Sequence, residues 1–427
     1  MRGRYRWLIP GMGVKRWIAL IILGVLLFTL AIIIWDFHVS SPAEARLLRL
    51  LNDYVSNVPA AAAALIVIGI GLVCLGIRNL IRSLIEVVSP DDVTDLAELV
   101  YRKRSLGRGP RIVVVGGGTG LSTLLRGLKD YSSNITAVVT VADDGGSSGR
   151  IREELGILPP GDIRNTLVAL ADTEPLMERL FQYRFTWGEG LTGHSFGNLF
   201  IAAMTDITGD FETAIKQFSK VLAVRGVVMP STLTKVKLKA VFTDGTEVIG
   251  ESKIPEARKK IASVSLVPRN VEPPPEALDA IENADVIVLG PGSLYTSVIP
   301  NLLVGKICEA IEASKATKVY VCNVMTQPGE TDQMSAADHV RAVLQHAGQR
   351  KIIDYVLINN QSLTPAQARK YGSEDSYPVK ADVNRVKQFG VIPVVAPMLD
   401  QGELVRHDAQ ALAKALIKLV LESKYLR

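Results

Sequence analysis

Two long apolar runs set the beginning of the chain apart from the rest. Residues 17–35 are apolar except for Thr29, and a second apolar run covers residues 59–77. Each is about as long as a helix that crosses a bilayer. Basic residues precede the first run and follow the second, so the positive-inside rule places both chain termini in the cytoplasm. A cleaved signal peptide fits less well, because the first run is long for one and a second run follows.

The pattern changes to β–α alternation beyond residue 110. Short β-branched runs alternate with stretches of helical spacing, which is typical of a mostly parallel sheet covered by helices on both faces. The expected strands are 112–115, 135–142, 284–289, 318–322, 352–358 and 391–395. The expected helices are 121–128, 165–170, 176–181, 196–204, 211–221, 302–314, 336–345 and 409–421. Residues 233–242 alternate strictly and Asp244-Gly245 follows, which predicts an inserted β-hairpin.

These patterns predict three regions. Residues 1–88 form a membrane anchor with two transmembrane helices, residues 89–110 form a charged linker, and residues 111–427 form an α/β domain with a Rossmann-like, doubly wound sheet. The anchor would hold this domain on the cytoplasmic side of the cell (inner) membrane.

Composition agrees with this division. The 427 residues are 48% hydrophobic, and the excess is concentrated in the two apolar runs. The net charge of +5 comes largely from the N-terminus, and the lysine row at 235, 237 and 239 lacks interleaved aromatic residues, so nucleic acid is not an expected partner. The three cysteines, Cys74, Cys308 and Cys322, fit no zinc or redox spacing, in agreement with a reducing compartment.

The chemistry centres on a glycine-rich loop after the first strand of the domain. Gly116, Gly117, Gly118 and Gly120, with Thr119 among them, lie between an apolar run and a helical stretch. Unpaired N–H groups and the helix dipole make such a loop an anion site, although a purely structural turn is the alternative. The spacing misses both Gly-x-Gly-x-x-Gly and the P-loop lysine. The loop therefore predicts a phosphate-bearing ligand, and the missed spacing disfavours a nicotinamide-dependent oxidoreductase.

Three further loops follow expected strands and should share the same sheet edge. Gly290, Gly292 and Ser293 repeat the glycine pattern, and Asn323 and Thr326 follow the next strand. The third loop holds Asp143, Asp144 and Ser147; one of its acids could accept from a ribose hydroxyl or hold a divalent cation, and the alternative is a solvated turn.

Two polar clusters lie outside these loops. Asp162 fits a helix N-cap, and Arg164 in the first turn opposes the helix dipole, which makes Arg164 a candidate phosphate contact. His194 could be a general acid or base, a phosphate contact or a structural hydrogen-bonding group. No catalytic triad is predicted.

The chain then shows a family resemblance. The segments GGGTG, TVADDGGSSGRIREELGILPPGDIRN, GHSFGNL, LGPGSLYTSVIPNLLV and NVMTQPGETD, in this order, resemble the CofD/YvcK family, and most closely its YvcK or gluconeogenesis factor branch, from residue 111 to the C-terminus. The CofD branch transfers phospholactate from a guanosine diphosphate-linked donor to a deazaflavin alcohol, with a metal ion. The YvcK branch binds UDP-sugars such as UDP-N-acetylglucosamine and is linked to gluconeogenic growth, cell shape and peptidoglycan precursor flow.

The resemblance implies a set of site residues and partners. Asp143, Asp144 and Asp162 correspond to metal-binding acids, with magnesium as the candidate ion. Asn165, His194 and Asn198 lie in matched motifs, and Arg406 resembles a basic ligand-binding position. We therefore expect a non-catalytic UDP-sugar-binding regulator, with a CofD-type transferase as the alternative and a homodimer as a candidate assembly. The predicted ligand-binding residues are Gly116, Gly117, Gly118, Thr119, Gly120, Asp143, Asp144, Ser147, Arg164, Asn165, His194, Asn198, Gly290, Gly292, Ser293, Asn323, Thr326 and Arg406.

Overall fold

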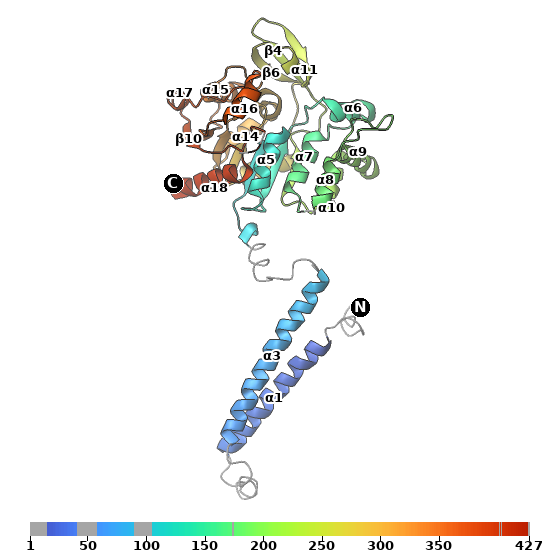
Figure 1. Cartoon of the computed structure of the whole chain (residues 1–427), viewed down its shortest axis with the longest axis vertical. Coiled ribbons are helices and arrows are strands. Elements are labelled where there is room, and N and C mark those ends of the chain that lie inside the picture. Colours follow the sequence, from blue (N-terminus) through green and yellow to red (C-terminus); the bar gives the residue numbers. More distant parts are fainter. Residues whose placement is uncertain are drawn as a thin grey trace, which may run out of the picture. The chain divides into compact units, whose positions relative to one another are not determined.

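The computed structural model describes residues 15–40, 58–88, 105–172, 175–400, 402 and 404–425, and the chain divides into two compact units, 1–102 and 103–427. The first unit contains two helices, α1 (Lys15–Ser40) and α3 (Val58–Val88), which pack along their length (Figure 1). Residues Lys15–Asp36 and Ala60–Ser83 are long and apolar enough to cross a membrane. A Cβ on Gly24 would lie 2.7 Å from the Gly69 carbonyl oxygen, so small residues let the two backbones approach closely.

The second unit is built on a seven-stranded parallel sheet with the order β10-β9-β8-β7-β1-β2-β3. The strands are β1 (Ile112–Gly116), β2 (Ile135–Val139), β3 (Val227–Pro230), β7 (Val286–Leu289), β8 (Thr317–Val321), β9 (Tyr355–Asn359) and β10 (Ile392–Ala396). All of β1 and β7 is buried, as their apolar sequences require. The chain adds strands on one side of β1 first and then on the other, so the strand order reverses between β1 and β7, which are neighbours. This pair is the topological switch point, where ligands of doubly wound proteins bind.

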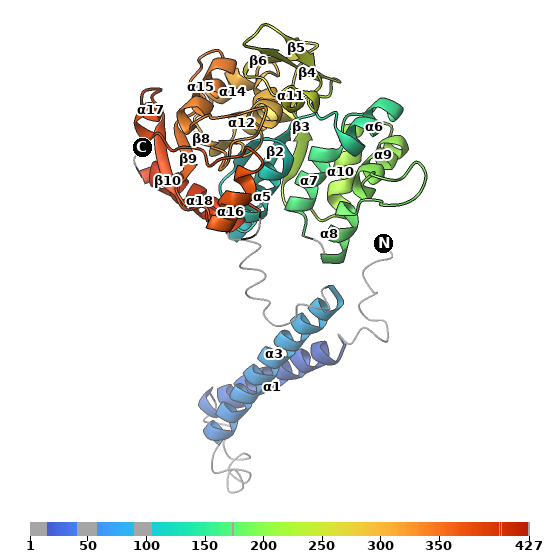
Figure 2. The same ribbon diagram turned by 45° about the horizontal axis from the view of Figure 1, so that its top comes forward.

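Helices cover both faces of the sheet. α5 (Gly118–Leu128) packs against α7 (Gly161–Leu170) and against α18 (Ala409–Tyr425). The chain crosses from β7 to β8 in the direction opposite to β1–β2, so right-handed crossovers place the helices of these two connections on opposite faces. The helices after β7 are the π-helical turn η2 (Leu294–Val298), α13 (Ile299–Leu302) and α14 (Ile307–Ala313). Figure 2 shows α6 (Gly146–Leu155), α7, α8 (Pro175–Gln182), α9 (Phe196–Thr208) and α10 (Phe211–Val221) gathered beside β3.

The predicted hairpin is confirmed and gains a third strand. β4 (Lys237–Phe242) pairs antiparallel with both β5 (Glu247–Ile249) and β6 (Ile261–Val267). The short helix α11 (Lys253–Glu256) lies between β5 and β6 in the chain. Leu238, Ala240 and Phe242 are buried, so the alternation indicated the core face correctly. The strand begins at Lys237 and not at residue 233, because the preceding segment does not join the ladder.

The mostly parallel α/β fold is confirmed, and several elements were not expected from the sequence. These are β3, β6, α6, α11, α12 (Pro275–Glu282), α16 (Pro365–Gly372) and α17 (Val383–Lys387). Most of them are short, so their periodicity is weak, and β3 ends on Pro230, a residue that suits only an edge strand. The helix expected at 165–170 begins earlier, at Gly161, directly after Pro160.

Candidate functional site

A cavity of about 590 Å³ opens at the switch point. The N-terminus of α5 lines one side of it through Gly118, Thr119 and Gly120, and the loop after β7 lines another through Gly292 and Ser293. Both glycine-rich loops predicted from the sequence therefore meet at one cavity. The predicted residues that line the cavity are Gly118, Thr119, Gly120, Arg164, Asn165, Gly292, Ser293, Asn323 and Arg406.

The two loops can meet because neither carries side chains at the contact. A Cβ on Gly120 would lie 3.0 Å from the carbonyl oxygen of Pro291, and one on Gly292 would lie 2.9 Å from that of Gly117. Gly118 adopts a φ of +69°, which favours glycine. The loops therefore pack backbone against backbone, and the amide groups of the first turn of α5, which have no partner within the helix, lie at the cavity.

A carboxylate lies beneath the first loop. A Cβ on Gly117 would come within 2.5 Å of Asp162 Oδ2, and the Gly118 N–H donates to the Asp162 carboxylate. Burial, and secondly repulsion from Asp143, raise the pKa of Asp162 to about 7. Asp162 does not act as the predicted N-cap of its own helix; that position is Pro160, and the carboxylate serves α5 instead.

The three acids predicted to hold a metal have different partners in the structure. Both carboxylate oxygens of Asp144 accept backbone N–H groups, from Glu251 at 3.0 Å and from Ser252 at 2.9 Å. Asp144 therefore ties the loop after β2 to the hairpin. Asp143 lies beside Gly161, and burial raises its pKa, against hydrogen bonds from Gly145 and Ser148. Within the described residues, no group of three or more His, Cys, Asp or Glu side chains is arranged to hold a metal ion.

The hairpin brings in a fourth acid that the sequence did not single out. Burial raises the pKa of Glu251 to about 8, with further contributions from Asp143, Asp144 and Asp162, and its carboxylate accepts from Thr296 in η2. Glu251 follows the return strand of a surface hairpin, so no local signal distinguishes it from a solvated residue. The tertiary fold places it beside Thr296 of η2 and near the three predicted acids.

Arg164 is the most deeply buried cation at the cavity, with 8% of its surface exposed. Its Nη1 donates to Asn198 Oδ1 at 2.9 Å and to Ser195 Oγ, and its Nη2 donates to Asn165 Oδ1 at 2.6 Å. All of these acceptors are neutral, and its Nε is buried without a partner. Burial, and secondly Arg184, lower the pKa of Arg164 to about 10. Such a cation lacks a direct counter-ion among the described residues, which an anionic ligand would supply.

Other predicted residues lie behind the cavity wall and do not line it. Ser147, His194 and Asn198 form one buried hydrogen-bonded cluster that contacts Arg164 through Asn198. Thr326 is also buried, and its hydroxyl accepts from the Tyr377 N–H at 2.9 Å. Gly116, Gly117 and Gly290 belong to the two loops without lining the cavity. These seven residues therefore contact the residues that line the cavity or belong to the lining loops, and do not line the cavity themselves.

The rest of the wall comes from segments distant in sequence. Arg126 and Gln182 come from α5 and α8, Gln327 follows β8, and Tyr371 lies in the last turn of α16. His407 is buried, and its Nε2 has no hydrogen-bond partner among the residues that the structure describes, as is also true of Asn323 Oδ1. Among the described lining residues the charged groups are Arg126, Arg164 and Arg406, and none is a carboxylate. Arg126 pairs with Glu178 and Arg406 pairs with Asp400, whereas Arg164 donates to neutral acceptors. The cavity therefore holds a buried cation and buried polar atoms that a ligand could satisfy.

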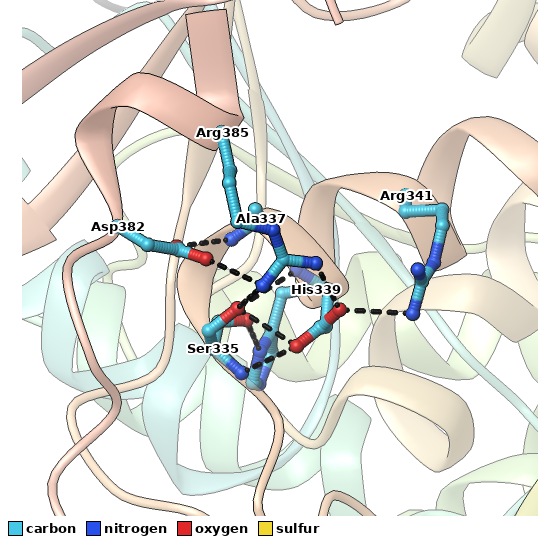
Figure 3. Close-up of polar contacts among 7 residues, drawn as sticks. Ser335, Ala337, His339, Arg341, Asp382 and Arg385 are labelled. Carbon is cyan, nitrogen blue, oxygen red and sulfur yellow. Dashed lines mark hydrogen bonds and ion pairs between the residues drawn. The ribbon is translucent and has the colours of Figure 1, made fainter. Parts of the chain in front are cut away.

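The wall segment after β8 is paired with the segment at residues 378–379. Met325 bridges to Pro378, and the Val379 N–H donates to the Val324 carbonyl. Further on, a polar network joins the start of α15 (Ala336–His346) to α17 (Figure 3). In it Ser335 and Asp338 form a capping box, and Arg385 donates to Asp382 and Asp338 as well as Ser335.

The fold and site define an α/β protein with a cavity at the switch point of a doubly wound sheet, lined by two glycine-rich loops and by three arginines among the described residues. The family described as 2-phospho-L-lactate transferase CofD matches residues 112–399, so the chain belongs to this family. A gluconeogenesis factor from Bacillus subtilis is 52% identical over 318 residues, which cover 74% of this chain and 100% of that protein.

A relative from Nostoc sp., whose name also includes the words gluconeogenesis factor, is 51% identical over 423 residues. That match covers 97% of this chain and 92% of the relative, so it extends into the apolar N-terminal region. A crystal structure of a Bacillus halodurans protein aligns with a TM-score of 0.70 and 52% identity, covering 72% of this chain and 99% of that one.

Replacement of Asp162 by Asn should change how stability depends on pH. The folded pKa of about 7 lies above the ordinary 3.8, so the stabilisation from the protonated carboxyl is present at low pH and is lost as pH rises through about 7. The melting temperature of Asp162→Asn relative to the unchanged protein should therefore increase from pH 4 to pH 8, measured on the full chain in detergent with a chelator. The surface variant Asp279→Asn should show no such trend; an equally flat Asp162→Asn curve would contradict the assignment.

Proposed function

We propose that the protein is a membrane-anchored regulator that binds a UDP-sugar such as UDP-N-acetylglucosamine. The observation that carries the proposal is the buried Arg164, which makes no ion pair with a carboxylate among the described residues and lies at a cavity shared with the N-terminus of α5. Helix N-termini and guanidinium groups both favour phosphate oxygens. The diphosphate would lie between the two glycine-rich loops and Arg164.

The polar atoms of the opposite wall suit the remainder of such a ligand. Asn323 Oδ1 and His407 Nε2 are buried without partners, and Tyr371 adds an aromatic ring to the lining. A sugar or a base carries hydroxyl and N–H donors that could satisfy these acceptors. The names of the relatives from Nostoc sp. and Bacillus subtilis support a role in gluconeogenic growth. Roles in cell shape and in the supply of envelope precursors are part of the same proposal.

Binding should depend on the charge of Arg164. Arg164→Gln should weaken UDP-N-acetylglucosamine binding by about 10- to 100-fold, because a hydrogen bond to a charged group contributes about 1.5–3 kcal/mol. Isothermal titration of the full chain in detergent measures this. The exposed Arg258, which pairs with Asp375, provides the control Arg258→Gln, for which no change is expected. If the unchanged protein does not bind the UDP-sugar saturably while other nucleotides bind, the UDP-sugar assignment fails.

A CofD-type transferase is the second candidate, favoured by the family match and by the acids beside the first loop. Asp143 and Asp162 would be the groups available to a magnesium ion, although the described acids do not form a ready site. A bound cation would lower the pKa of both carboxyls. Incubation with a guanosine diphosphate-linked phospholactate donor, a deazaflavin alcohol and magnesium should give no transfer if the regulatory proposal holds. Turnover that is lost in a folded Asp162→Ala variant would establish the transferase instead.

We further propose that the domain of residues 103–427 lies in the cytoplasm, because basic residues flank the two candidate spans on one side. A cysteine introduced between the spans, Asn52→Cys, should react with a membrane-impermeant thiol reagent in intact cells. Ser373→Cys, at an exposed position of the domain, should react only after the membrane is opened. The reverse labelling pattern would contradict the orientation.

A further inference from the structure

The start of α9 carries a polar motif that the proposed binding role does not use directly. His194, Ser195 and Asn198 are each at most 4% exposed and none lines the cavity. Yet Ser195 Oγ and Asn198 Oδ1 are both acceptors for Arg164 Nη1. The motif therefore contacts the guanidinium of Arg164 without lining the cavity.

The backbone of α9 also fits closely around the same arginine. A Cβ on Gly197 would lie 2.6 Å from Cδ and 2.9 Å from Cγ of Arg164. Ser195 Oγ is at the same time the N-cap of α9, because it accepts the Asn198 N–H. The aliphatic part of Arg164 thus packs against the first turn of α9. The N-cap residue of this helix, Ser195, accepts a hydrogen bond from the guanidinium.

The hydrogen bonds of Ser147 extend the contact one layer further. Ser147 Oγ accepts from the Ser195 N–H at 3.3 Å and from Asn198 Nδ2 at 3.2 Å, which occupies both of its lone pairs. Its hydroxyl hydrogen is then directed to His194 Nδ1 at 3.1 Å, which must be unprotonated to accept it. Burial, Arg150 and Arg184 lower the pKa of His194 against an opposite effect of Glu154, in agreement with a neutral ring.

Every bond in this chain of donors has a defined direction. Ser147 donates to His194, the Asn198 amide donates to Ser147, and the Asn198 carbonyl oxygen is left to accept from Arg164. The order fixes which end of the Asn198 amide faces the arginine. Asn165 accepts from Arg164 Nη2, so both terminal nitrogens of Arg164 donate to neutral acceptors. The buried Nε of Arg164 has no hydrogen-bond partner among the described residues.

We propose that Asn198 and Ser147 are positioning residues that orient Arg164 toward the ligand phosphates through uncharged contacts, so that its positive charge stays available. The inference rests on the proposed binding of a phosphate-bearing ligand, but it assigns the His-Ser-x-x-Asn motif a role other than contact with ligand. Replacement of either residue should then affect the anionic part of the ligand and spare its uncharged part.

Asn198→Asp provides the sharpest test, because it keeps the shape of the side chain and the acceptor facing Arg164 but adds a negative charge. It should weaken binding of UDP-N-acetylglucosamine and of inorganic diphosphate by tenfold or more, and change uridine binding by less than twofold. Ser147→Ala, which removes the group that orients the Asn198 amide, should show a smaller loss with the same selectivity. Titration calorimetry on the full chain in detergent measures all three probes.

Matched controls separate positioning from general damage. Asn283→Asp at the end of α12 and Ser219→Ala on α10 alter the same residue types outside the cavity lining and should change no affinity. Equal losses for uridine and for the phosphate-bearing probes would show a merely structural role. Unchanged diphosphate binding in Asn198→Asp, alongside a loss in Arg164→Gln, would overturn this inference alone. Failure of the unchanged protein to bind diphosphate would overturn the inference together with its basis, whereas failure with the UDP-sugar alone would affect only the proposed function.

Discussion

The contact between the two glycine-rich loops is the constraint on which the rest of the site depends. Gly120 meets Pro291, and Gly292 meets Gly117, at distances that leave no room for a Cβ atom. The contact is possible only because β1 and β7, which are far apart in sequence, are neighbours in the sheet. It brings the N-terminus of α5 and the loop before η2 to one cavity, and the carboxylates of Asp162 and Glu251 lie against the same two segments.

Charge is distributed unequally on the two sides of these loops. On the cavity side, the described wall residues carry three arginines and no carboxylate. On the other side, Asp143, Asp162 and Glu251 repel one another, and the pKa of each is raised mainly by burial. The acids therefore lie outside the described cavity lining, which holds Arg164 together with Arg126 and Arg406, the last two paired with Glu178 and Asp400. This arrangement supports binding of an anion at the cavity. Asp144, in contrast, ties the loop after β2 to the hairpin through its two hydrogen bonds.

The sequence led to part of the site and missed the rest for identifiable reasons. The glycine-rich loops, Arg164, Asn165, Asn323 and Arg406 were predicted, and they line the cavity. His194 and Asn198 were assigned to the ligand because they lie in motifs matched to the family; in the structure they belong to the hydrogen-bonded cluster that contacts Arg164. Tyr371, Gln182 and His407 carry no local signal, since each becomes part of the wall only through the packing of α8, α16 and the segment before α18.

The sequence by itself determined the alternation of strands and helices, the glycine turns after β1 and β7, the alternating hairpin strand and the two apolar helices. These features depend on local periodicity and on backbone freedom, which each short segment carries with it. Only the tertiary structure decided which polar groups face the cavity. Asp144 became an acceptor of two backbone N–H groups, Glu251 joined the buried acids, and Asn198 came to accept from Arg164. The reason is physical: the partner of a buried polar side chain is set by contacts between distant segments, and the sequence around the residue does not contain them.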